Sequence, residues 1–375
     1  MMVHRIMMIA GEASGDAHGA GVIRELKLRQ PDIRITGMGG EKMQNEGMNI
    51  LHHVREMSFM GFLEVVKHLP LIRRVEKDLE RELRTRRPDV VVFIDYPGFN
   101  LRFARTVKRL GIKSFYYISP QVWAWKKGRV KKIKALIDKM LVVFPFEVPI
   151  YNNAHVPVQF VGHPIVEEMQ QTLSREEFCV KYRLDPKKKF IAVIPGSRKQ
   201  EIESLFSSML HAAGAIAGSE RSTEVLVAVA PNLSEELYHG GSTPDAPVRY
   251  IQHATHEIMK YAEFAFVTSG TATLETACSE TPMVVVYKTS AITYWIARFF
   301  VNIKNIALVN IVAEKTVVPE IIQHDVTVDR LVREARSILA SPERILTMKL
   351  QLREVKEKLG GAGAARNVAE AILAV

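Results

Sequence analysis

The chain has 375 residues, of which 47% are hydrophobic and 25% are charged, as is typical of a protein with two globular domains. Its formal net charge of +10 could attract nucleic acid, an anionic membrane or phosphorylated substrates, but the aromatic fraction of 8% carries no basic-aromatic pattern of RNA binding, so we expect no nucleic-acid partner. The two cysteines, Cys179 and Cys278, exclude a disulfide framework and a cysteine-based metal site.

Short apolar runs alternate with amphipathic helical patterns along the chain. In the first half we expect strands at 5–10, 32–38, 90–94, 113–118 and 139–144, and helices at 16–30, 70–86, 101–110 and 128–137. The rhythm begins again with a strand at 190–194 and a helix, followed by strands at 224–230, 248–251, 264–268 and 283–287. Nearly all-apolar strands are typical of parallel sheets that helices cover on both faces.

These elements predict an α/β fold of two Rossmann-like, doubly wound domains that face each other across a cleft. We place the domains at 1–164 and 165–349, with a C-terminal helix at about 350–375 that could pack back on the first domain. The apolar run near the N-terminus predicts a buried strand and not a signal peptide. No apolar run approaches the roughly 18 residues of a membrane span.

We expect ligand-binding residues in the turns after the strands, because parallel sheets bind ligands at the carboxyl ends of their strands. After the first strand comes GEASGDAHG (11–19), whose glycines allow a sharp turn and a close approach to a ligand. Its spacing matches neither the dinucleotide fingerprint nor the phosphate loop of nucleoside triphosphatases. The alternative is a tight turn in which Ser14 or Asp16 caps the following helix.

Two further turns in the first half carry reactive or aromatic side chains. Asp95 directly follows the strand at 90–94, where a carboxylate is well placed for general-base catalysis and an apolar wall would raise its pKa; the alternative is a helix cap. The turn at 118–126 carries Trp123 and Trp125, and the cations Lys126, Lys127 and Arg129 lie close by in the sequence. The tryptophans could form a wall for a sugar or an acyl chain, or they could be packing residues.

The second half has two turns suited to phosphate. The strand at 190–194 ends in PGSRKQEI (195–202), where a glycine turn and a helix start would cradle a diphosphate and Arg198 could bind two of its oxygens. The alternative is a helix cap with a solvated arginine. The strand at 264–268 ends in SGTATLETA, in which Glu275 lies one helical turn past Thr271 and suits ribose hydroxyls. A capping box explains part of that pattern.

Several of these segments resemble those of lipid-A-disaccharide synthases. They are GEASGD (11–16), SFMGFLEV (58–65), IDYPGFN (94–100), YYISPQVWAW (116–125), FPFE (144–147), FVGHP (160–164), PGSRKQEI (195–202), VTSGTATLE (267–275), LVNIV (308–312) and GGAGAARNVAEAIL (360–373). The resemblance runs nearly end to end and is weakest at about 205–260.

The resemblance implies the glycosyltransferase-B fold and an inverting sugar transfer. A UDP-2,3-diacylglucosamine donor would glycosylate the 6-hydroxyl of 2,3-diacylglucosamine 1-phosphate, which gives the β-1,6-linked lipid A disaccharide 1-phosphate and UDP. The sequence contains no Asp-x-Asp motif, so neither Mg²⁺ nor another cofactor is expected.

The resemblance also assigns roles to the turns. Asp95 matches the family's essential aspartate and is the expected base, with His18 and Glu12 as alternatives, and Arg198 would stabilise the departing UDP. The other expected substrate contacts are Ser14, Gly15, Asn100, Gln121, Trp123, Gly196, Ser197, Ser269, Gly270, Thr271, Thr273 and Glu275, with Asn310 and Glu320 as further candidates on the donor side.

Acylated substrates imply a membrane contact. The segment 57–74 combines apolar side chains with a basic flank, as interfacial helices do, and its expected contacts are Met57, Phe59, Met60, Phe62, Leu63, Val66, Leu69, Arg73 and Arg74. A second such segment is YWIARFF (294–300); core packing is the alternative for both. We therefore expect a cytoplasmic protein docked peripherally on the anionic inner membrane, as a monomer or a homodimer.

Two other functions stay open on the sequence. One is a UDP-sugar 2-epimerase on the same fold, which would share the UDP site but need no acyl-chain groove. The other is a non-catalytic basic binding module, in which Asp95 would be dispensable.

Overall fold

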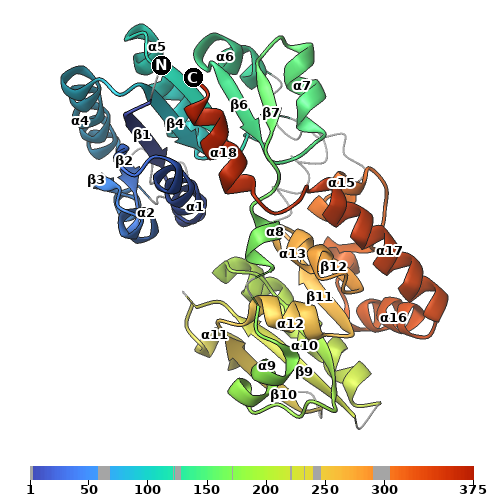
Figure 1. Ribbon diagram of the computed structural model, residues 1–375. Helices are drawn as coiled ribbons and strands as arrows, with labels where there is room; N and C mark the ends of the chain where they lie inside the picture. Colours follow the sequence, from blue (N-terminus) through green and yellow to red (C-terminus); the bar gives the residue numbers. More distant parts are fainter. Residues whose placement is uncertain are drawn as a thin grey trace. The chain divides into compact units, whose positions relative to one another are not determined.

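The computed structural model describes residues 3–57, 68–120, 122, 128–170, 172–219, 222–231, 233–239, 246–289 and 305–375. The chain divides into two compact units: unit 1 combines Met1–Pro164 with Gly360–Val375, and unit 2 is Ile165–Leu359 (Figure 1). The C-terminal residues therefore belong to two units, because α17 (Pro342–Lys358) lies in unit 2 and α18 (Ala364–Leu373) lies in unit 1.

Unit 1 is built on a seven-stranded parallel sheet in the order β3-β2-β1-β4-β5-β6-β7. The strands are β1 (Arg5–Ala10), β2 (Arg34–Gly39), β3 (Asn49–His53), β4 (Val90–Ile94), β5 (Lys113–Tyr117), β6 (Lys139–Val142) and β7 (Val158–Phe160). The strand order reverses between β1 and β4, which pair in register from Ile6 with Val90 to Ala10 with Ile94. Such a switch point leaves a crevice at the carboxyl ends of the two strands.

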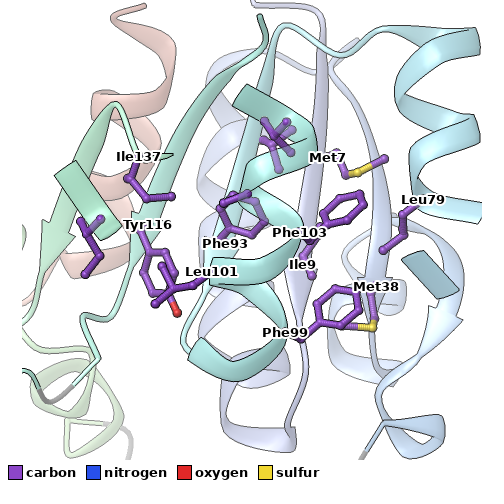
Figure 2. Packing of buried hydrophobic residues seen from close by; sticks show 14 of the residues in the cluster. Met7, Ile9, Met38, Leu79, Phe93, Phe99, Leu101, Phe103, Tyr116 and Ile137 are labelled. Carbon is purple, nitrogen blue, oxygen red and sulfur yellow. The ribbon is translucent and has the colours of Figure 1, made fainter. Parts of the chain in front are cut away.

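Helices cover both faces of this sheet. They are α1 (Ala13–Arg29), α2 (Glu41–Asn45), the 3₁₀ turn η1 (Val54–Glu56), α4 (Leu69–Arg86), α5 (Pro97–Arg109), α6 (Gly128–Leu136), α7 (Glu147–Asn153) and α18. Figure 2 shows Met7, Ile9 and Phe93 on one face, packed against α4 and α5 through Leu79, Phe99 and Phe103. α1 packs on the other face and against α18. Burial from both sides explains why β4 is uninterrupted VVVFI.

Unit 2 repeats the plan with a six-stranded parallel sheet in the order β10-β9-β8-β11-β12-β13. Its strands are β8 (Lys189–Ile194), β9 (Thr223–Val229), β10 (Val248–Gln252), β11 (Phe264–Thr268), β12 (Met283–Tyr287) and β13 (Glu320–Ile322). Its other elements are α8 (Ile165–Glu168), α9 (Arg175–Tyr182), α10 (Lys199–Ala217), α11 (Glu236–His239), α12 (Thr255–Tyr261), α13 (Ala272–Cys278), α15 (Leu308–Ala313), η2 (Gln323–Asp325), α16 (Val328–Leu339) and α17.

The prediction of two doubly wound α/β sheets is confirmed. Every strand pairing among the described residues is parallel. Each sheet has its switch point between its first strand and the strand that follows the crossover, β1 with β4 and β8 with β11. Among the helices that the structure describes, none is long and apolar enough to cross a membrane.

Candidate active site

The glycines in the turn after β1 allow close packing of neighbouring residues and do not leave the backbone open to a ligand. A Cβ on Gly11 would lie 2.1 Å from Cδ1 of Tyr96, so the ring of Tyr96 occupies the space that the glycine leaves. Gly15 is buried against Ala10 and Ile94, where it brings α1 close to the sheet. Glu12 and Ser14 are exposed at the start of α1. Of the residues expected to bind substrate in this turn, Glu12 and Ser14 are therefore the two with exposed side chains.

Asp16 does not cap its own helix. Its carboxylate is buried and accepts hydrogen bonds from the backbone N–H groups of Gly40 at 2.7 Å, Met43 at 3.0 Å and Lys42 at 3.1 Å. These are donors at the start of α2, which a carboxylate stabilises by capping. The structure therefore corrects the alternative interpretation of this turn, because Asp16 ties α1 to α2.

Asp95 directly follows β4, at the switch point between β4 and β1. Asp95 and Tyr96 have φ angles of 45° and 47°, in the left-handed region that residues with a Cβ rarely adopt. Burial raises the pKa of the Asp95 carboxyl to about 6, and the nearby negative charge of Glu12 adds to the rise, although a hydrogen bond from the Tyr96 backbone opposes it. A carboxylate with a pKa near the working pH is the kind of group that serves as a general base.

Two neutral histidines belong to the same unit. Burial, with help from the charge of Lys42, lowers the pKa of His18 on α1 to about 4. Burial also lowers the pKa of His163, which follows β7, to about 3, and the neighbouring His18 contributes. Both imidazoles are therefore uncharged at neutral pH, when each can donate and accept hydrogen bonds. His163 was not among the expected site residues, although its segment FVGHP is part of the resemblance.

The turn after β5 rests on a buried polar cluster of Ser119, Glu147 and Tyr151. Ile118 has a φ of 65°, and the Ser119 hydroxyl lies 2.7 Å from the hydroxyl of Tyr151. Burial raises the pKa of Glu147 to about 8, although hydrogen bonds with Ser119 and with backbone N–H groups oppose the rise. Glu147 is therefore mostly protonated at neutral pH. No role was predicted for this cluster. The expected contacts Gln121 and Trp123 lie outside the described residues.

Two expected contacts in unit 1 are corrected by their burial. Asn100 is 0% exposed, and its Nδ2 donates to the main-chain oxygen of Asp95 at 2.7 Å, so it braces the turn from inside the core. Met57 is 1% exposed and packs in the core beneath α4 and α5, so the predicted membrane contact is wrong for this residue. Leu69 is partly buried, while Arg73 and Arg74 are exposed on α4.

The other predicted membrane contacts cannot be placed. Phe59, Met60, Phe62, Leu63 and Val66 lie outside the described residues, as does the segment 294–300.

In unit 2, the turn after β8 holds an internal carboxylate. Gly196 has a φ of +106°, and Glu201 accepts hydrogen bonds from the backbone N–H groups of Ser197 at 3.2 Å and Arg198 at 3.3 Å. The Arg198 side chain is 69% exposed and contacts Glu201 at 3.4 Å. Two backbone N–H groups of the turn that was expected to hold a diphosphate are therefore bonded to a carboxylate of α10.

The turn after β11 divides its polar side chains between surface and core. Gly270 has a φ of +151° with open space around it, and Thr271 is exposed at the start of α13. Ser269 is partly buried. Burial raises the pKa of Glu275 to about 7, and the negative charge of Glu168 on α8 contributes. The predicted substrate contact of Thr273 is corrected, because its side chain is 0% exposed and its hydroxyl donates to the Gly270 oxygen at 2.8 Å.

Asn310 and Glu320 brace one another instead of facing a ligand. Asn310 is 0% exposed; its Oδ1 accepts from the N–H groups of Val317 and Val318, and its Nδ2 donates to Glu320 at 2.8 Å. The Glu320 carboxylate also accepts from the N–H groups of Ile306 at 2.8 Å and Ala307 at 3.0 Å, at the start of α15. Both carboxylate oxygens of Glu320 thus accept hydrogen bonds from within the protein. The predicted contact with the UDP-sugar is therefore corrected for both residues.

Solved structures share this architecture. A putative UDP-N-acetylglucosamine 2-epimerase from Listeria monocytogenes has a TM-score of 0.67 at 14% identity and covers 98% of this chain and 95% of its own. The calicheamicin glycosyltransferase CalG4 has a TM-score of 0.62 at 15% identity, and the match covers 100% of this chain and 98% of CalG4. At these identities the likeness shows the fold alone, which is the glycosyltransferase-B fold. The two doubly wound sheets thus define the chain as a member of the glycosyltransferase-B fold class.

Sequence comparison narrows this class. A family model described as lipid-A-disaccharide synthetase matches residues 6–373. The lipid-A-disaccharide synthase of Geobacter sulfurreducens is 39% identical over 371 residues, which are 99% of this chain and 97% of the relative. The lipid-A-disaccharide synthase of Syntrophus aciditrophicus is 42% identical over 366 residues, which are 97% of this chain and 96% of the relative. The chain belongs to the lipid-A-disaccharide synthase family and is a glycosyltransferase, as the sequence motifs predicted.

Proposed function

We propose that Asp95 is the general base of a single in-line displacement that joins two diacylglucosamine units. Asp95 takes the proton from the 6-hydroxyl of the 2,3-diacylglucosamine 1-phosphate acceptor. The acceptor oxygen forms a bond to C1 of the UDP-linked 2,3-diacylglucosamine on the face opposite UDP. The bond from C1 to the diphosphate oxygen breaks, and UDP leaves with its electron pair. An α-linked donor therefore gives a β-1,6 product.

The observation that carries this proposal is the setting of Asp95 at the switch point of unit 1. A pKa of about 6 leaves the carboxylate mostly ionised at neutral pH, yet makes it more basic than an ordinary aspartate. The charge of Glu12 raises that pKa further and adds negative potential, which favours the oxocarbenium-like transition state of glycosyl transfer.

Unit 2 supplies the contacts to the departing UDP in this proposal. The Ser197 and Arg198 N–H groups already bind the carboxylate of Glu201, and a diphosphate carries more negative charge, so it displaces that carboxylate. The exposed Arg198 guanidinium then neutralises charge on the diphosphate as the sugar bond breaks. Gly270 and Thr271 offer the start of α13, and Glu275 accepts hydrogen bonds from the ribose hydroxyls.

The same proposal includes a peripheral membrane contact through unit 1. α4 carries exposed Arg73, Arg74, Lys77, Arg81 and Arg84. Its buried face, formed by Ile72, Val75, Leu79 and Leu83, is already taken by the core of unit 1, so α4 attracts an anionic lipid surface by charge and not by insertion.

The test is UDP release from diacylated donor and acceptor by wild type, Asp95→Ala and Arg198→Ala. We expect a loss of about 10²–10⁴-fold for Asp95→Ala and about 10²–10³-fold for Arg198→Ala. Matched controls are Asp32→Ala and Arg333→Ala, which replace exposed residues of the two units and should keep wild-type rates. Near-normal turnover by Asp95→Ala would remove the base from the mechanism. Conversion of UDP-N-acetylglucosamine without acceptor would favour the epimerase alternative.

A further inference from the structure

The main chain at Asp95 is held in an unusual conformation. Asp95 and Tyr96, with φ angles of 45° and 47°, are the one adjacent pair of non-glycine residues with positive φ in the part of the chain that the structure describes. Aspartate tolerates the left-handed region better than most residues, but tyrosine does not. Two such residues in succession persist only where their surroundings hold them.

Two buried side chains hold the carbonyl oxygen of Asp95. The Tyr116 hydroxyl donates to it at 2.6 Å, and the Asn100 Nδ2 donates to it at 2.7 Å. Both side chains are 0% exposed. Tyr116 belongs to β5, beside Phe93 of β4 in the sheet register, and Asn100 belongs to the first turn of α5. Donors from two elements therefore converge on one oxygen and satisfy both of its lone pairs.

The N–H of Asp95 is held as well, because it donates to the Tyr117 oxygen at 3.0 Å. The peptide groups on both sides of the Asp95 Cα are thus fixed by β5 and α5. Relaxation of φ from 45° to the ordinary value near −60° would turn the side chain by about 105° around the N–Cα bond. The direction of the carboxylate therefore depends on the hydrogen bonds to its own main chain.

We propose that Tyr116 and Asn100 are positioning residues, whose hydrogen bonds to the Asp95 carbonyl aim its carboxylate at the acceptor hydroxyl. The inference rests on the proposed role of Asp95 as the base. Neither side chain reaches the substrate, since both are fully buried; they act through the backbone. Loss of one bond lets the Asp95 side chain turn toward water, which also removes part of the desolvation that raises its pKa.

The test is Tyr116→Phe, which keeps the ring beside Phe93 (Figure 2) and removes only the hydroxyl. We expect kcat to fall by about 10- to 100-fold, since small misplacement of a reacting group has effects of that size, with the KM of both substrates unchanged within about twofold. The acid limb of the kcat/KM profile, which reports the free enzyme, should move from near pH 6 toward the range of an ordinary aspartate. Asn100→Leu, which keeps the branched shape of four side-chain heavy atoms but has no donor, should act in the same direction.

The matched control is Tyr261→Phe in unit 2, whose hydroxyl likewise donates to a backbone oxygen, that of Leu173. It should leave both kcat and the pH profile unchanged. In an Asp95→Ala background, Tyr116→Phe should cause no further loss, because its effect passes through the carboxylate. If Tyr116→Phe fails to fold by circular dichroism, Asn100→Leu carries the same comparison.

The outcomes separate the two proposals. An active Asp95→Ala variant overturns the base itself. An inactive Asp95→Ala variant, together with a Tyr116→Phe variant that matches Tyr261→Phe in kcat and in its acid limb, overturns the positioning role alone. The positioning role is also contradicted if Tyr116→Phe lowers kcat by the same factor in the wild-type and Asp95→Ala backgrounds.

Discussion

Gly11→Ala is the substitution whose effect the structure defines most sharply. The added Cβ would lie 2.1, 2.3 and 2.6 Å from Cδ1, Cγ and Cε1 of Tyr96, whereas carbon atoms pack at about 3.5 Å or more. The ring must therefore move by about 1.4 Å. Its hydroxyl donates to the Met57 oxygen at 2.9 Å, and a shift of that size breaks this bond.

The free energies involved follow from these contacts. Overpacking costs about 1–3 kcal/mol, and the lost hydrogen bond about 1 kcal/mol, so we expect unfolding to become easier by about 2–4 kcal/mol. Because Tyr96 follows Asp95 directly, its displacement also moves the proposed base, and turnover should fall by about 100-fold. The φ of Gly11 lies outside the left-handed region, so alanine brings no backbone strain of its own.

The assay is urea unfolding followed by circular dichroism for Gly11→Ala, Tyr96→Ala and the double variant. Without the ring, the glycine substitution should cost less than about 0.5 kcal/mol, so the pair should be strongly non-additive. Gly98→Ala is the control, because nothing lies within 4 Å of its added Cβ and an alanine favours the helix. A Gly11→Ala penalty that is the same in both backgrounds would refute the packing argument.

Three further predictions follow from charge and ionisation. Asp95 must be ionised to act as a base and its pKa is about 6, so kcat/KM should fall as the pH drops through that value; a flat profile would contradict the assignment. Burial raises the pKa of Glu147 from 4.5 to about 8, so the folded state keeps a proton that the unfolded state releases between these values, and stability should decline as pH rises through this window. Urea unfolding at both ends should show a smaller decline in Glu147→Gln than in wild type, because the raised pKa values of Asp95 and Glu275 remain in the variant. Reversing the charge of Arg73 and Arg74 together should weaken flotation with anionic vesicles at low salt, while Arg330→Glu on α16 should have no such effect.

The sequence predicted the central strands almost to the residue. β4, β11 and β12 lie where continuous apolar runs placed them, because burial on both faces leaves no room for polar alternation. The edge strands β3, β7 and β13, with the sequences NILHH, VQF and EII, were missed. They are short and only partly buried, so their pairing with a neighbouring strand defines them and their own composition does not.

The sequence by itself also determined the family and the position of Asp95, since motifs and strand ends are local features of the chain. It did not determine which polar side chains of the turns face outward. Asn100, Thr273 and Asn310 looked like ligand contacts, yet each is fully buried and bonded to the backbone. Their partners, and the Tyr116 hydroxyl that meets the carbonyl of Asp95, come into reach only once neighbouring strands and helices have packed. The tertiary structure alone decided these roles, because a polar side chain suits a buried place as well as an exposed one when neighbouring elements bring hydrogen-bond partners to it.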